Sequence, residues 1–234
     1  GIGSAPKFPN PAILELLWRT ALRTKDAGLR DTVTLTLDAM SQGGIYDHLG
    51  GGYARYSTDD KWLVPHFEKM LYDNAQIIDL LTWAWQETGS ALYAARVSET
   101  AGWVFREMIA DGGGFAATID ADSEGEEGRF YVWTADQIDR ALGDDSGFFK
   151  AAYDVSPEGN WEGKTILNRT ARPVLLGAAE EGRLEACRAK LLAERDKRTR
   201  PGWDDKVLAD WNGLMIAAMA NAAAAFGEPR WHDT

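Results

Sequence analysis

Residues 43–74 of the chain are GGIYDHLGGGYARYSTDDKWLVPHFEKMLYDN. This stretch holds five glycines, four tyrosines and two of the chain's three histidines. The paired and triple glycines allow backbone angles that other residues avoid, so the first half is expected to turn sharply. Pro65 is expected to introduce a helix that begins near His66 and ends near Thr88. The sequence therefore predicts a loop rich in hydrogen-bonding groups that leads directly into a helix.

Apolar residues recur at helical spacing on both sides of this stretch. Asn10-Pro11 precedes an apolar face typical of a helix, which Gly28 is expected to end. Residues 32–37 alternate threonine with apolar residues, as a strand would, but the spacing around them favours a helix. Further apolar patterns predict helices over residues 97–108, 184–192 and 211–226. The last of these is apolar enough to be buried on most sides.

Two short β-rich runs interrupt the helical pattern. Phe115–Ile119 and Arg129–Trp133 flank an acidic loop, residues 120–128, which predicts a β-hairpin with a long tip. The loop resembles the start of a calcium-binding loop, but Tyr131 stands where the bidentate glutamate should be. A solvated, charged tip is therefore favoured over a metal site, and neither a metal nor a cofactor is expected.

Helices that alternate with long loops predict a mainly α protein with small β-hairpin excursions. An α/α toroid of helical hairpins fits this pattern, and an irregular helical bundle fits it almost as well. The chain has 234 residues, of which 45% are hydrophobic. This is enough to bury one substantial core, so residues 1–234 are expected to form a single domain.

Composition limits the class of partner and the compartment. A net charge of −11 argues against nucleic acid and anionic membranes, which attract basic surfaces. No export signal or membrane-spanning run is recognisable, and the single cysteine, Cys187, excludes an internal disulfide, so a cytoplasmic location is expected. Ten tryptophans and seven tyrosines stand out. Some of these rings are expected to line a pocket for a small ligand such as a sugar.

His48 and His66 are the candidates for proton transfer. Histidine titrates near neutrality, and neighbouring carboxylates can orient it. A purely structural, hydrogen-bonded role is equally open for each histidine. On a helix that starts at His66, Asp73 would share its face about 10 Å away, which leaves room for a sugar. Asp73 and Asn74 could equally cap or bridge helices.

Six stretches of the chain carry a resemblance to a known family. They are residues 5–9 (APKFP), 43–56, 62–75, 120–133, 159–167 and 204–216. With these motifs in this order, the chain resembles the YyaL-like family of thioredoxin-domain-containing proteins, related to spermatogenesis-associated proteins of animals. The resemblance implies a thioredoxin-like module followed by a six-hairpin α/α toroid, similar to sugar 2-epimerases and certain glycoside hydrolases.

This chain departs from the family pattern in two respects. The thioredoxin-like module is absent, and the toroid stops early, so the chain is expected to be a fragment of the toroid domain. An open toroid exposes apolar surface that further hairpins would cover. Self-association through that edge is therefore expected.

The resemblance implies carbohydrate chemistry of one of two kinds. In the related epimerases, paired histidines remove and return a proton beside the carbonyl of the ring-opened sugar. In the related hydrolases, carboxylates protonate the glycosidic oxygen or activate water. The candidate catalytic residues are His48, His66, Asp73, Asp204 and Asp205. The candidate substrate-binding residues are Tyr46, Asp47, Arg55, Trp62, Glu68, Asn74, Trp161, Trp211 and Asn212.

The alternative hypothesis is a non-catalytic domain. Such a domain would bind a glycan or peptide, or support the missing redox module. Glycine-rich turns and buried polar caps could also be purely architectural, because a toroid needs both.

Overall fold

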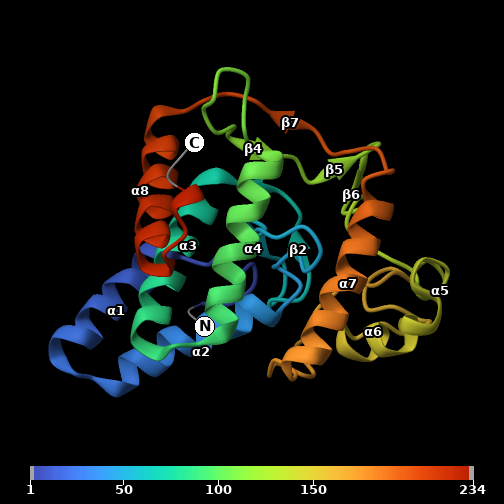
Figure 1. Ribbon diagram of the computed structural model, residues 1–234, viewed down its shortest axis with the longest axis horizontal. Helices are drawn as coiled ribbons and strands as arrows, with labels where there is room; N and C mark the ends of the chain where they lie inside the picture. Colours follow the sequence, from blue (N-terminus) through green and yellow to red (C-terminus); the bar gives the residue numbers. More distant parts are fainter. Residues whose placement is uncertain (1–2, 232–234) are drawn as a thin grey trace.

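The computed structural model describes residues 3–231 and is mainly helical, as predicted (Figure 1). The helices are α1 (Pro11–Thr24), α2 (Ala27–Gln42), α3 (Leu71–Thr88), α4 (Ala91–Glu107), α5 (Ala135–Leu142), α6 (Ser146–Ala152), α7 (Ala178–Arg195) and α8 (Ala209–Phe226), with short 3-10 turns at Gly143–Asp145 and Pro229–Trp231. The strands are β1 (Tyr56–Ser57), β2 (Pro65–His66), β3 (Lys69–Met70), β4 (Thr118–Ile119), β5 (Asp122–Ser123), β6 (Glu126–Glu127) and β7 (Trp203–Asp204).

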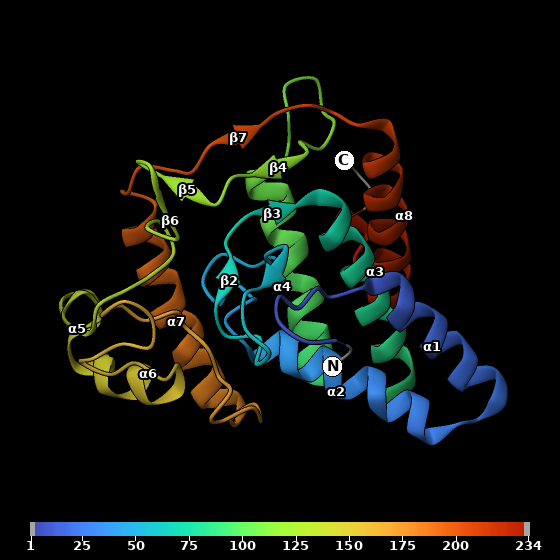
Figure 2. The same ribbon diagram turned by 180° about the vertical axis from the view of Figure 1, so that it is seen from behind.

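The main core lies between helical hairpins. Two-residue turns join α1 to α2 and α3 to α4, so the members of each pair run antiparallel, and α8 packs along α3 (Figures 1 and 2). Their facing apolar side chains form the largest buried cluster, which includes Trp18, Leu37, Ile78, Val104 and Met215. Paired helices joined alternately by short turns and long loops agree with the expected partial α/α toroid.

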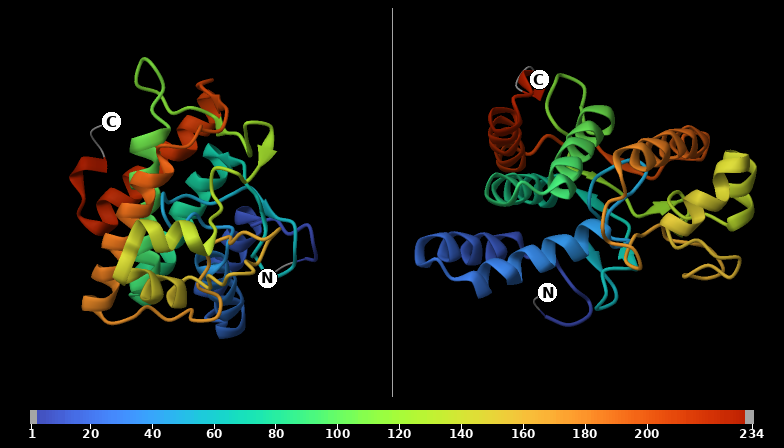
Figure 3. Two further views of the ribbon diagram at one scale, coloured as in Figure 1. Left: turned by 90° about the vertical axis from the view of Figure 1, so that its right-hand side faces the viewer. Right: turned by 60° about the horizontal axis from the view of Figure 1, so that its bottom comes forward.

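A second group of helices stands beside the first. α5, α6 and α7 enclose their own apolar cluster, which includes Ile138, Phe149, Leu184 and Leu191 (Figure 3). Cys187 is buried in this cluster and packs as a small apolar residue. In the described part of the chain, no helix combines the length and apolar character needed to cross a membrane.

A small antiparallel sheet brings three distant loops together. Its strand order is β3-β4-β7, and Lys69, Ile119 and Trp203 lie in one row, with Met70, Thr118 and Asp204 in the next. Residues directly opposite each other on neighbouring strands point to the same face of a sheet. The sheet therefore places Lys69 and Trp203 on one face and Asp204 on the other.

The predicted start of the helix after Pro65 is wrong. Pro65–His66 pairs with Tyr56–Ser57, Lys69–Met70 pairs with β4, and the helix begins only at Leu71. Pro65–His66 and Lys69–Met70 form strand hydrogen bonds in place of a helix. The spacing of apolar residues within this stretch does not reveal the strands with which they pair. His66 and Asp73 consequently do not lie on one helix face.

Two further expectations need correction. Residues 129–133 form no strand with residues 115–119; the observed hairpin is β5–β6, inside the acidic loop. Helix α8 is not buried on most sides, because Leu214 and Ile216 are exposed. The helical interpretation of residues 32–37 is confirmed by α2. A capping box of Thr134 and Gln137 starts α5.

Candidate functional site

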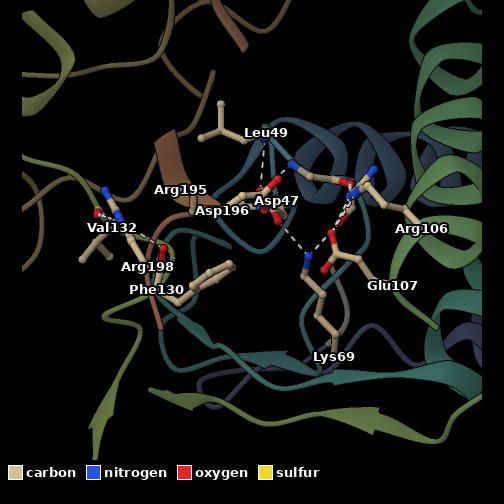
Figure 4. Close-up of polar contacts among 12 residues, drawn as sticks. Asp47, Leu49, Lys69, Arg106, Glu107, Phe130, Val132, Arg195, Asp196 and Arg198 are labelled. Atoms are coloured by element: carbon tan, nitrogen blue, oxygen red, sulfur yellow. Dashed lines mark hydrogen bonds and ion pairs between the residues drawn. The ribbon is translucent and has the colours of Figure 1, made fainter. Parts of the chain in front are cut away.

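Asp47 holds a buried ion network with Lys69 and Arg195, which we call the Asp47 network (Figure 4). Its Oδ2 accepts from the Lys69 ammonium at 2.8 Å, and its Oδ1 accepts from Arg195 Nη1 at 2.8 Å. Oδ1 also accepts the backbone N–H groups of Leu49 and Gly50 at 3.0 Å. Burial raises the pKa of Asp47, but Arg195 and Lys69 more than offset this and hold it well below the usual range. The network thus ties the glycine-rich loop to β3 and α7.

His48 is buried beside this network and is neutral. Its Nε2 donates to the Gly43 carbonyl at 3.0 Å, so Nδ1 is left as an acceptor, and it has no partner within residues 3–231. Burial, and next the charge of Arg96, lower its pKa well below 6.5. The cavity that His48 lines has a volume of about 30 Å³. That is room for about one water and not for a sugar.

Tyr46 packs its ring on the edge of His48 and donates its hydroxyl to Glu99 at 2.6 Å. The guanidinium of Arg96 lies 4.3 Å from the centre of the Tyr46 ring. Burial raises the pKa of Tyr46 well above its ordinary value, and the charge of Glu99 raises it further. Tyr46 is therefore a neutral, fixed hydrogen-bond donor in the wall of this small cavity.

A larger cavity, which we call the Glu107 cavity, lies beyond Tyr131 and has a volume of about 330 Å³. Phe130, Tyr131 and Trp203 supply aromatic walls, and Trp203 is 45% exposed. Glu107 is the last residue of α4, and its side chain is only 8% exposed. Figure 4 shows it pointing toward Lys69 of the Asp47 network.

Two arginines of the Glu107 cavity hold its carboxylate. Arg106 donates to Glu107 Oε1 from Nη2 at 2.6 Å and from Nε at 3.0 Å. Arg200 Nη1 lies 3.4 Å from Oε2. The cavity therefore combines aromatic faces with charged donors and acceptors at the end of the molecule where the long loops gather.

A second polar group, which we call the Asp73 cluster, consists of Arg55, His66, Glu68, Tyr72 and Asp73. Arg55 Nη1 donates to Glu68 Oε2 at 3.0 Å, and His66 Nε2 lies 3.7 Å from the same oxygen. The other His66 ring nitrogen, Nδ1, is 2.8 Å from Glu127 Oε1. The side chains of His66 and Glu68 are 27% and 21% exposed, so both reach solvent.

Asp73 is the most unusual carboxyl of this cluster. It lies in the first turn of α3, is 6% exposed, and its Oδ2 finds no hydrogen-bond partner in the described residues. Burial raises its pKa to about 7, although Arg55 and Tyr72 act in the opposite direction. At neutral pH Asp73 is therefore about half protonated and able to give or take a proton.

The two histidines belong to different groups. His48 contacts Gly43, Tyr46 and Tyr153, whereas His66 contacts Tyr56, Glu68 and Glu127. Within residues 3–231 they do not face each other across a cavity.

Asn74 and Asn212 hold loops onto helix starts in the same way. Asn74 exchanges two hydrogen bonds with the backbone of Tyr53 and donates a third to Met70. Asn212 exchanges two with the backbone of Phe115 and donates a third to Leu208. Each asparagine lies in the first turns of its helix, α3 or α8. Through these matching hydrogen bonds, each asparagine side chain fixes a loop to the start of a helix.

The remaining predicted site residues are dispersed. Trp62 is 2% exposed with Lys7 over its ring, and Trp161 packs on Phe67. Trp211 packs on Tyr72, which places it beside the Asp73 cluster. Asp204 is paired with Lys206 at 2.9 Å, which lowers its pKa, and Asp205 is exposed. No group of three or more His, Cys, Asp and Glu within residues 3–231 is arranged to hold a metal ion.

Comparison with known proteins tests the family expectation. No family model matches the chain. Spermatogenesis-associated protein 20 of Homo sapiens is 36% identical over 271 residues, which cover 98% of this chain and 34% of that protein. The Mus musculus protein of the same name is 35% identical, covering 97% and 33%. Both proteins are homologues of this chain, and the similarity extends over almost all of the chain. The chain spans about a third of the length of the curated relatives it matches.

A solved structure of a sugar epimerase from a ruminal bacterium is also similar. It has a TM-score of 0.43 and 14% identity, and the match covers 94% of this chain and 71% of that chain. Three of the motif stretches contribute residues to the sites described above. Residues 43–56 and 62–75 contribute Asp47, Lys69 and the Asp73 cluster, and residues 120–133 contribute Phe130 and Tyr131.

The sequence did not identify several residues of these sites, namely Lys69, Arg106, Glu107, Arg195, Arg200 and Trp203. One signal was present in the sequence for Arg195. Leu184, Cys187 and Leu191 form the buried stripe of α7, and Arg195 continues it one turn later. A charged residue on an apolar stripe indicates a buried partner, which here is Asp47.

Proposed function

We propose that the chain is the ligand-binding part of a carbohydrate-active toroid protein and that a neutral sugar occupies the Glu107 cavity. The observation that carries this proposal is the combination of three aromatic walls with a nearly buried carboxylate. Aromatic faces pack on the C–H faces of sugar rings, and charged groups accept from and donate to the hydroxyls.

The size and polarity of the cavity support a sugar over other ligands. Its volume of about 330 Å³ lies in the range of small-molecule sites. Arg106 pairs with Glu107, and Arg200 pairs with both Glu107 and Asp196, so a neutral ligand leaves no charge unpaired. Trp203 presents apolar area to solvent that a bound ring would cover.

A second candidate function is sugar isomerisation, of the 2-epimerase kind, or glycoside hydrolysis, and the pKa of Asp73 favours it. A carboxyl group with a pKa of about 7 can protonate a glycosidic oxygen or take a proton from carbon at neutral pH. The separation of His48 from His66 favours a mechanism built on this carboxyl rather than on paired histidines. Asp73→Asn would then abolish turnover of a sugar panel and leave sugar binding at the Glu107 cavity intact.

The binding proposal is tested by a screen of mono- and disaccharides with two tryptophan variants. Trp203→Ala should weaken the best sugar ligand at least 10-fold in calorimetric titration, because it removes one wall of the cavity. Trp161→Ala, a matched change at a tryptophan outside the Glu107 cavity, should bind as the parent does. Absence of binding by every sugar, or a loss confined to Trp161→Ala, would reject the Glu107 cavity as the site.

A further inference from the structure

A third cavity, which shares Phe130 with the Glu107 cavity, differs in charge from the rest of the molecule. We call it the Arg198 cavity. It has two parts of about 450 and 560 Å³, which share Gln137 and Arg198 as lining residues. Five cations and three carboxylates line it. This surplus of positive charge occurs in a protein with a net charge of −11.

Two of these cations have no carboxylate partner. The three carboxylates, Glu124, Glu126 and Glu194, pair with Arg129, Lys164 and Lys197. Arg140 and Arg198 form no ion pair with any residue from 3 to 231, and both line the 450 Å³ part. The two cations without a carboxylate partner therefore both line this part of the cavity, which Glu194 also lines.

The guanidinium of Arg198 is held in a fixed orientation. Its Nη1 donates to the carbonyls of Phe130 and Val132 at 2.8 Å each (Figure 4), and its Cζ lies 4.0 Å from the ring centre of Trp133. Nε and Nη2 donate to no residue in the described range. These two groups form the edge of a guanidinium that matches two oxygens of one oxyanion.

Further groups at this position complete the donor set. The capping box of α5 holds the Gln137 side chain, because its Oε1 accepts the Thr134 N–H at 2.9 Å. The Gln137 amide Nε2 is thereby left as a donor with no partner in the described part of the chain. Burial, together with the neighbouring Arg195, lowers the pKa of Arg198 to about 10, which is the response of a cation that lacks a counter-charge.

We propose that the 450 Å³ part of the Arg198 cavity is a binding site for a phosphate group, with Arg198 and Arg140 as its cationic ligands and Gln137 as a further donor. The phosphate is supplied either as the free ion or as the phosphate group of a small phosphorylated sugar. The site is separate from the Glu107 cavity, and its occupancy does not depend on the function proposed for that cavity.

The test is calorimetric titration of the whole chain with inorganic phosphate, glucose 6-phosphate and glucose at constant ionic strength. Arg198→Lys keeps the charge and can still donate to the two carbonyls, but it loses the two-donor edge. It should weaken phosphate binding at least 10-fold. Arg140→Gln, at an exposed position that does not threaten folding, should weaken it at least 3-fold. Arg183→Gln, which removes a charge on α7 that is paired with Asp145, should change binding less than 2-fold.

The outcomes separate the possible ligands and the failure modes. Tighter binding of glucose 6-phosphate than of inorganic phosphate assigns the site to a phosphorylated sugar, and equal binding assigns it to the free ion. The proposal is overturned if phosphate shows no saturable binding, if Arg198→Lys and Arg140→Gln both bind as the parent does, or if Arg183→Gln weakens binding as much as they do. Binding of glucose that Arg198→Lys leaves unchanged belongs to the Glu107 cavity.

Discussion

Asp47 and Asp73 both lie within residues 43–74, yet their surroundings shift the pKa of the carboxyl group in opposite directions. Asp47 meets two buried cations and two backbone N–H groups, so its ionised form is strongly favoured. Asp73 is buried with an unpartnered oxygen, so its neutral form is favoured. Burial alone therefore does not determine the charge of a carboxyl group; the number of donors that reach it does.

This difference separates two roles within one stretch of sequence. The charges of the Asp47 network are paired inside the protein and join three distant segments, which is what a structural element requires. The Asp73 cluster keeps a titrating carboxyl next to half-exposed groups, which is what acid–base chemistry requires. Predictions that break either arrangement follow, in order of expected effect.

Asp47→Ala should have the largest effect on stability. It leaves Lys69 and Arg195 buried without a counter-charge, which costs about 3–5 kcal/mol in comparable buried pairs. Glu68→Gln, which removes the partner of the half-exposed Arg55, should cost less than about 1 kcal/mol. Denaturant unfolding of both variants measures their free energies of unfolding. If both variants lose the same free energy of unfolding, the Asp47 network is not more stabilising than the Arg55–Glu68 pair.

Asp73→Asn should change the pH dependence of stability. The folded pKa of Asp73, about 7, lies above its ordinary value of 3.8, so the parent loses stability as pH rises from about 4 to 7. The variant should therefore match the parent near pH 4 and exceed it at pH 8 by an amount on the order of 4 kcal/mol. Asp205→Asn, at an exposed position, serves as the control and should follow the parent at both pH values.

Asp47→Asn should produce the opposite profile. Because the pKa of Asp47 is lowered on folding, its contribution is present at neutral pH and is lost as pH falls below about 4. The variant should be much less stable than the parent at pH 7 and should approach it in acid. A constant difference between pH 7 and pH 3 would contradict the pairing.

The smallest effect on stability is expected from the exposed apolar residues of α8. Leu214 and Ile216 are exposed on either side of its buried stripe, and we propose that this apolar surface mediates self-association of the chain. The double variant Leu214→Ser with Ile216→Ser should reduce the associated fraction in light scattering. Its free energy of unfolding should change by less than about 0.5 kcal/mol. A parent that stays monomeric at high concentration would exclude this association.

Helices were predictable from sequence where local spacing was sufficient. Trp18 and Leu37 lie on the apolar faces that the spacing of apolar residues predicts. The capping box at Thr134 forms between residues that are close in the sequence. The two-residue strands were not predictable, because His66 pairs with Tyr56 and Lys69 pairs with Ile119, which lies 50 positions away. Because these residues pair as strands, α3 begins at Leu71 and not near His66.

The candidate site was predictable only in part for the same reason. The stretch from Gly43 to Asn74 does contribute to both polar groups, but the partners that determine the chemistry come from elsewhere. Arg195 belongs to α7, and Glu107 ends α4. No local pattern in the stretch itself could tell that folding would lower the pKa of Asp47 and raise that of Asp73.

The most direct test of this contrast is the titration of the two side-chain carboxyl groups by carbon NMR, with Asp47→Asn and Asp73→Asn used for assignment. The structure predicts that the Asp73 carboxyl titrates near pH 7 and that the Asp47 carboxyl remains ionised down to below pH 4. Titration of both groups together near pH 4 would contradict the account.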